Sequence, residues 1–151
     1  MPEEETLERA LEDKREGKAP STQAGEFVRE EMHHIREGVH GARSTKQAIA
    51  IGLSKARRAG VDLPPPPKGT VSEKTRKSAE HAYEEGQRHP RKKPSTKRSR
   101  ATLHALQREG HRAASHRALA RQAHRRAQKR SSAQRSAAAR KAARTRAAHS
   151  K

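Results

Sequence analysis

Large apolar side chains are scarce in this sequence, and their scarcity limits what the chain can fold into. Phe27 and Tyr83 are its two aromatic residues, Trp is absent, and apolar residues make up 29% of the 151 residues. Charged residues make up 35%, and the mean hydropathy is −1.28. Ordinary globular domains carry nearly half apolar residues. Because little apolar surface is available to offset the entropy of ordering the backbone, we predict a mostly α-helical chain with extensive disorder.

The net charge of the chain is +19, and it is unevenly distributed. Residues 1–43 carry a net charge of −4 and residues 44–86 a net charge of +3. Residues 87–151 carry +20, since 21 Lys and Arg side chains stand against Glu109 alone. Self-repulsion of this size disfavours a compact state and favours a polyanionic partner. An acidic head joined to a basic tail is typical of nucleic-acid-binding proteins.

The sequence lacks the signals that are typical of several classes of function. The chain has no Cys, and its ten His residues show no i,i+4 zinc spacing backed by a carboxylate, so we expect no metal. It has no Gly-rich phosphate loop and no core to hold a nucleophile beside a base, so we expect no cofactor, no small-molecule substrate and no enzymatic activity. The longest apolar stretch, residues 48–53, is far shorter than the about 20 residues of a membrane span. We expect a soluble, cytoplasmic protein without a membrane partner.

Hydrophobic periodicity and breaker residues divide the chain into five segments. We predict an acidic helix at residues 1–17, a helical hairpin at 24–60, a Pro-rich linker at 61–69 and a short helix at 70–86 with little to bury. Residues 87–151 form a basic, low-complexity tail rich in Ala and Arg. Both residues favour helix, so we expect this tail to be disordered when free and helical once its charges are neutralised.

The hairpin is the best-organised segment. Its first helix is predicted by apolar residues at spacings of 4, 3 and 4, namely Val28, Met32, Ile35 and Val39. Its second helix is predicted to begin at a capping box formed by Ser44 and Gln47, and to end before Gly60 in the C′ position.

The second helix of the hairpin has apolar residues on two sides. Ile49, Leu53 and Ala56 form its predicted inner face, whereas Ile51 lies nearly opposite Ile49 and Leu53. A second apolar face on a short helix indicates self-association or docking of a partner. We therefore include a homo-oligomer formed through the hairpin among the expectations.

The basic side chains suit a polyphosphate ladder better than a discrete site, because each phosphate that they neutralise releases counterions. Arg outnumbers Lys in the tail, and its planar fork suits bidentate contact with phosphate. No aromatic residue is interleaved with the tail's cations to stack on single-stranded bases, which favours duplex DNA or structured RNA. The predicted phosphate-binding residues are Lys46, Lys55, Arg57, Arg58, Arg91, Lys92, Lys93, Lys97, Arg98, Arg100, Arg112, Arg117, Arg121, Arg125, Arg126, Lys129, Arg130, Arg140, Lys141, Arg144 and Arg146.

The block from Gly41 to Ala56 resembles an uncharacterised family of small basic bacterial proteins. That family shares the pattern Ser-x-Lys-Gln-Ala-Ile-Ala-Ile-x-Leu-Ser, preceded by a short helix with Glu-Gly, here Glu37 and Gly38. The resemblance covers roughly residues 20–62, and members of the family are often labelled DNA-binding. The Ala/Arg/Lys tail separately resembles the tails of bacterial histone-like proteins in composition.

These observations lead to one function hypothesis and two alternatives. The first is low-specificity DNA binding through phosphate contacts, as in a nucleoid protein. The second keeps the same chemistry but takes structured RNA, including ribosomal RNA, as the partner. The third is a protein-interaction adaptor that uses the hairpin, with the tail serving to localise it.

Overall fold

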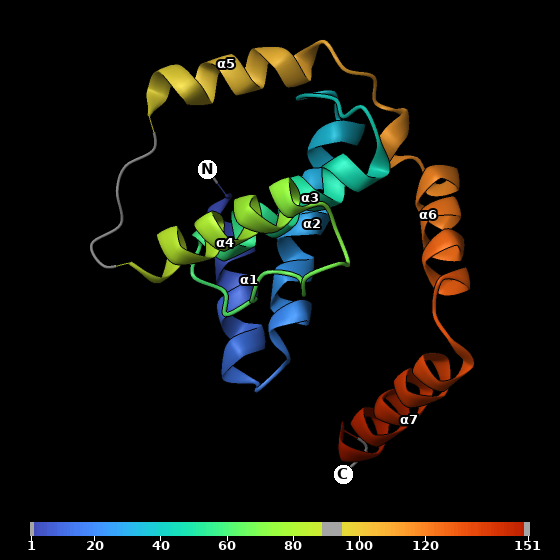
Figure 1. The fold of residues 1–151 in the computed structure, drawn as a ribbon. Helices are drawn as coiled ribbons and strands as arrows, with labels where there is room; N and C mark the ends of the chain where they lie inside the picture. The colour runs from blue at the N-terminus through green and yellow to red at the C-terminus, as the bar shows by residue number, and fades with distance from the viewer. Residues whose placement is uncertain (1, 89–94, 150–151) are drawn as a thin grey trace. The chain divides into compact units, whose positions relative to one another are not determined.

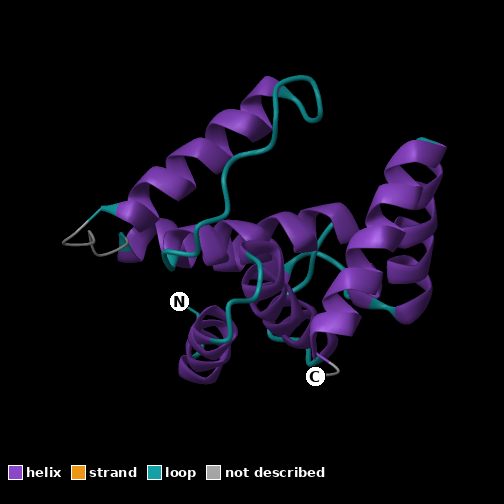
Figure 2. Cartoon of the chain, turned by 90° about the horizontal axis from the view of Figure 1, so that it is seen from below, coloured by secondary structure: helices purple, strands orange, loops and turns teal. Residues whose placement is uncertain are grey.

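The computed structural model describes residues 2–88 and 95–149, which form helices and loops without a strand (Figures 1 and 2). The chain divides into two compact units, Met1–Ser115 and His116–Lys151. The elements of the first unit are α1 (Glu4–Arg15), α2 (Pro20–Arg36), α3 (Thr45–Arg58), α4 (Glu73–Gln87), α5 (Thr96–Gln107) and the 3-10 helix η1 (Arg112–Ala114). The second unit consists of α6 (His116–Gln128) and α7 (Ser132–His149).

Our prediction of extensive disorder is wrong. Most described residues are helical, and α5, α6 and α7 lie in the basic segment that we expected to be disordered when free. In the first unit the prediction failed because it counted large apolar side chains, whereas the core of this unit is closed largely with small ones. Fully buried positions include Ala24, Ala48, Ala56, Ala82 and Ala114.

The central contact of the first unit is the packing of α2 against α3. The buried line of α3 consists of Thr45, Ala48, Gly52 and Ala56. At Gly52 the two helices approach so closely that a Cβ atom would lie 2.7 Å from Val28 Cα. The predicted inner-face residues Ile49 and Leu53 are only partly buried. Small residues therefore set the distance between the helices, and the larger residues flank the contact.

This close approach predicts opposite effects for the same substitution at two helical glycines. Gly52→Ala is expected to destabilise the protein by about 1–3 kcal/mol, because the added methyl group has to displace the backbone of α2. Gly25→Ala, in α2, meets nothing within 4 Å and is expected to stabilise by about 0.5–1 kcal/mol through helix propensity. Urea unfolding followed by far-UV circular dichroism measures both. Equal effects of the two substitutions would contradict the close packing.

A small apolar core joins α1, α2, α3 and the start of the Pro-rich segment. Phe27 is its largest fully buried side chain, and α1 lies beside α2 in Figure 1. The buried members of this core are Ala10, Ala24, Phe27, Ala56 and Val61, and Leu7, Leu53, Ala59 and Leu63 pack against them.

Helix α4 packs on α3, although we predicted that it had little to bury. Its buried residues are Ala79, Ala82 and Gly86. A Cβ atom at Gly86 would lie 1.8 Å from the Arg57 carbonyl oxygen, so the glycine is what allows the approach. The Tyr83 hydroxyl donates to Asp62 Oδ1 at 2.7 Å, and this hydrogen bond connects α4 to the segment that precedes it.

Part of the predicted tail folds back on the turn between α2 and α3. The Gly41 N–H donates to the Leu106 carbonyl oxygen at 2.9 Å, and the Thr45 hydroxyl donates to the Ala113 carbonyl oxygen at 2.7 Å. A Cβ atom at Gly41 would lie 2.0 Å from the Glu109 carbonyl oxygen, so this contact needs a glycine. Residues 106–115 consequently belong to the first folded unit rather than to a free tail.

The helix ends follow local chemistry. The Gln47 N–H donates to Ser44 Oγ at 3.2 Å, which confirms Ser44 as the N-cap of α3. The Gln47 side chain also reaches back, but its Oε1 accepts from the Arg43 N–H at 2.8 Å, one residue before the cap. Gly60 follows the helix with a φ of 93°, as the predicted C′ residue should. Ser95 caps α5 in the same way, through the Arg98 N–H. Among the described helices, none is long and apolar enough to cross a membrane.

Candidate functional site

The second unit concentrates positive charge. Residues 116–151 contain twelve Lys and Arg residues and neither Asp nor Glu. Every Lys and Arg of this unit that the structure describes is exposed. Because the segment holds no acidic side chain, none of these cations can be neutralised by a carboxylate side chain of its own unit.

The cations are arranged differently on the two helices of this unit. In α6, Arg117, Arg121 and Arg125 recur every four residues, which aligns them along one side of the helix. Leu119 lies on the opposite side and is partly shielded. In α7 the cations are spread around the helix and form no single stripe. We call Arg117, Arg121 and Arg125 the arginine stripe.

The predicted phosphate-binding residues that lie outside the second unit fall into three groups. Exposed cations of the first unit are Lys46, Arg58, Lys97, Arg98, Arg100 and Arg112. Arg91, Lys92 and Lys93 lie outside the described residues. Lys55 and Arg57 make contacts within the fold through their charged groups. Lys55 pairs with Glu30 and Glu31. Arg57 Nε donates to the Leu63 carbonyl oxygen at 3.0 Å, and burial lowers the pKa of its guanidinium group. Ile51 is half-buried on α3, and its role in self-association stays a prediction.

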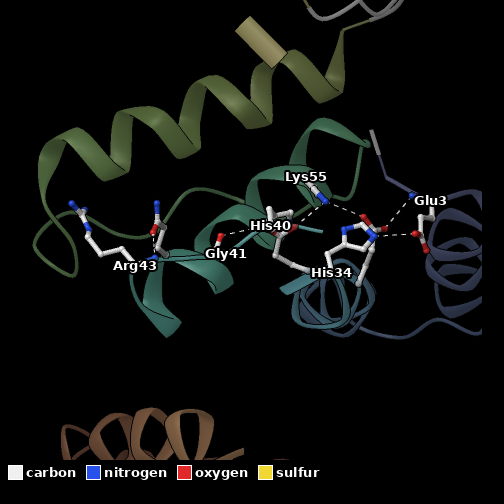
Figure 3. A network of polar contacts seen from close by, with 9 residues as sticks. Glu3, His34, His40, Gly41, Arg43 and Lys55 are labelled. Carbon is white, nitrogen blue, oxygen red and sulfur yellow. Dashed lines mark hydrogen bonds and ion pairs between the residues drawn. The ribbon is translucent and has the colours of Figure 1, made fainter. Parts of the chain in front are cut away.

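A second candidate site, which the sequence analysis missed, is a buried polar network around α2 (Figure 3). The side chains of Glu30 and Glu31 are 1% and 0% exposed. Lys55 reaches across from α3, so that its Nζ lies 3.0 Å from Glu30 Oε1 and 2.8 Å from Glu31 Oε2. Two adjacent buried carboxylates thus share one ammonium group.

The charges of this network influence one another. Burial alone would raise the pKa of the Glu30 carboxyl, but hydrogen bonds from the Lys55 ammonium and the Glu3 N–H hold it below its usual value. Burial likewise opposes the charge of Lys55, and the two carboxylates more than compensate, so that the pKa of Lys55 is raised. At neutral pH both Glu30 and Lys55 are therefore charged inside the fold.

Two histidines border the same network. His34, on α2, has its Nε2 2.9 Å from Glu3 Oε1, and His40, on the turn after α2, has its Nε2 3.2 Å from Glu31 Oε1 (Figure 3). The two rings stand edge to face, with centroids 6.0 Å apart. His40 Nδ1 donates to the Gly41 carbonyl oxygen at 3.1 Å. Donor atoms of Glu31, His34 and His40 all lie within 4.8 Å of one another.

One sequence signal could have revealed part of this network. Phe27, Glu31 and Ile35 are spaced four residues apart and are all fully buried, so the glutamate occupies a core position of an amphipathic helix. His34 follows Glu31 by three residues and shares its side of the helix. The place of His40 depends on the path of the turn, which no periodicity predicts.

The comparisons with known proteins bear on this first unit. Residues 17–68 match a family of unknown function (DUF6496). The matched segment contains α2, α3 and the turn between them, hence Glu31, His34, His40 and Lys55, while Glu3 lies before it. No curated protein and no solved structure matches the chain.

Proposed function

We propose that the protein binds DNA with low sequence specificity, through contacts of its basic second unit with phosphates. The observation that carries the proposal is the acid-free sequence of residues 116–151, whose described cations are all exposed on helices. The Lys and Arg side chains of such a segment neutralise phosphates and so release the counterions condensed on the DNA, which drives association. A nucleoid-type role in the cytoplasm is consistent with this chemistry.

Because the exposed cations lie on α-helices, duplex DNA is favoured over duplex RNA as the partner. An α-helix with its side chains is about 10–12 Å across and enters the major groove of B-DNA, which is about 12 Å wide. The major groove of A-form RNA is too narrow to admit it. Helices α6 and α7, with 13 and 18 residues, are about 20 and 27 Å long at 1.5 Å per residue and can follow several phosphates each.

The first test is a competition titration of the full chain against duplex DNA and structured RNA of equal length over a salt series. We expect a logarithmic salt slope steeper than about −4, corresponding to five or more phosphate contacts, and a preference for duplex DNA. A preference for the RNA would transfer the proposal to structured RNA. Weak binding of both at about 0.15 M salt would contradict phosphate binding by this unit.

A further inference from the structure

We infer that Glu31, His34 and His40 form a binding site for Zn²⁺ between α2 and the turn that follows it. This inference is independent of DNA binding, since it concerns only the first unit. Figure 3 shows His34 and His40 near each other, with Lys55 and Glu3 beside them. Four observations carry the inference: the donor set, the hydrogen bond of His40 Nδ1, the oxygens of Glu31 and the surrounding charge.

The donor set is the first observation. Two imidazole nitrogens and one carboxylate oxygen are a ligand set that zinc takes in proteins, with a fourth position left for water or another ligand. Glu31 and His34 form a Glu-x-x-His pair on one side of α2, a spacing that directs both groups into metal sites of helical bundles. Their donor atoms and that of His40 lie within 4.8 Å of one another. Ligands about 2.0–2.2 Å from one ion stand about 3.4 Å apart in a tetrahedron, so the most widely separated donor atoms must approach by up to about 1.4 Å.

The hydrogen bond of His40 Nδ1 is the second observation. A carbonyl oxygen can only accept, so the hydrogen bond to the Gly41 carbonyl places the proton on Nδ1. In the neutral ring, Nε2 then presents a lone pair to Glu31 Oε1, 3.2 Å away. Two lone pairs at this distance repel each other unless a proton or a metal ion lies between them. A histidine whose far nitrogen donates to a backbone carbonyl is also the usual arrangement of a metal ligand.

The third observation concerns the two carboxylate oxygens of Glu31, whose ion pair with Lys55 leaves hydrogen-bonding capacity unused. The side chain of Glu31 is 0% exposed, and neither of its oxygens accepts a hydrogen bond of ordinary geometry, although Lys55 and His40 lie close to them. A buried carboxylate normally has its acceptor sites filled. A bound cation would fill them.

The surrounding charge is the fourth observation. When the histidines are neutral, the network has three negative groups, the carboxylates of Glu3, Glu30 and Glu31. Its one positive group is the Lys55 ammonium. Lys55 remains paired with Glu30 at 3.0 Å if Glu31 turns to a metal ion. The site can therefore take a divalent cation without leaving the ammonium unpaired. The Glu3 carboxylate, held to His34, is positioned either to orient that ring or to complete the coordination.

The test is a calorimetric titration of the metal-stripped full chain with ZnCl₂, comparing the wild type with single His→Gln variants. We expect one tight site per chain in the wild type, and a loss of more than about 100-fold in affinity in His34→Gln and in His40→Gln. His33→Gln is the matched control, since His33 neighbours His34 but is exposed and outside the site. It is expected to bind as the wild type does. Unchanged zinc affinity in all three variants would overturn the inference, because it would assign the zinc to other histidines.

A spectroscopic measurement on a chain that keeps both His34 and His40 tests the site even if the His34→Gln and His40→Gln variants fail to fold. In long-range ¹⁵N–¹H spectra of the His33→Gln chain, one equivalent of Zn²⁺ should shift the ring nitrogens of His34 and His40 and leave the other histidines unchanged. Shifts distributed over the remaining histidines, or none at His34 and His40, would refute the site. Agreement of the spectra with the titration establishes it.

Discussion

Replacing Lys55 with Met is expected to lower the free energy of unfolding by about 3–5 kcal/mol, because it leaves two buried carboxylates without their shared cation. The methionine retains the apolar part of the side chain, so the loss reports on the charge rather than on packing. A domain of this size has a total stability of about 5–15 kcal/mol. Urea unfolding in the presence of EDTA, which keeps metal ions away from Glu31, measures the effect.

The matched control is Arg88→Met. Arg88 pairs with Glu85 at 3.0 Å at the end of α4, but its side chain is 57% exposed. Exposed ion pairs contribute about 0–1 kcal/mol, so this variant should be nearly as stable as the wild type. If Lys55→Met also proved as stable as the wild type, Glu30 and Glu31 would have to be protonated or hydrated, and the buried network described above would be incorrect.

Substituting Gln for all three residues of the arginine stripe is expected to reduce the logarithmic salt slope of DNA binding by about 3 and to weaken binding at 0.1 M salt on the order of 100-fold. Each arginine that neutralises a phosphate contributes about 0.9 to the slope, and the stripe places three on one side of α6. Fluorescence anisotropy with labelled duplex DNA, repeated at several salt concentrations, measures both quantities.

A control variant separates location from net charge. Lys14, Arg15 and Arg43 are exposed cations of the first unit, and replacing them with Gln removes the same amount of charge. These three substitutions should change the slope by less than about 1. Equal losses in the two triple variants would mean that DNA responds only to net charge, and the proposal that the second unit is the binding surface would fail.

Helix ends were predictable because they are set by neighbours in the chain. Ser44, Gln47 and Gly60 specify the start and end of α3 through hydrogen bonds and backbone conformation within a few residues. The segregation of charge is equally a property of the linear chain, since the absence of Asp and Glu after residue 115 can be read directly. The order of residues alone therefore indicates the candidate phosphate-binding segment.

The sequence by itself thus determined the helical periodicity, the caps and the acid-free second unit of this protein. Only the tertiary structure decided that the first unit is folded rather than disordered, because close approaches at Gly52 and Gly86 bury small residues that a count of large apolar side chains omits. It alone brought Lys55, His40 and Glu31 together, from α3, a turn and α2. Such contacts depend on the distance and crossing of helices, and the chemistry of neighbouring residues specifies neither.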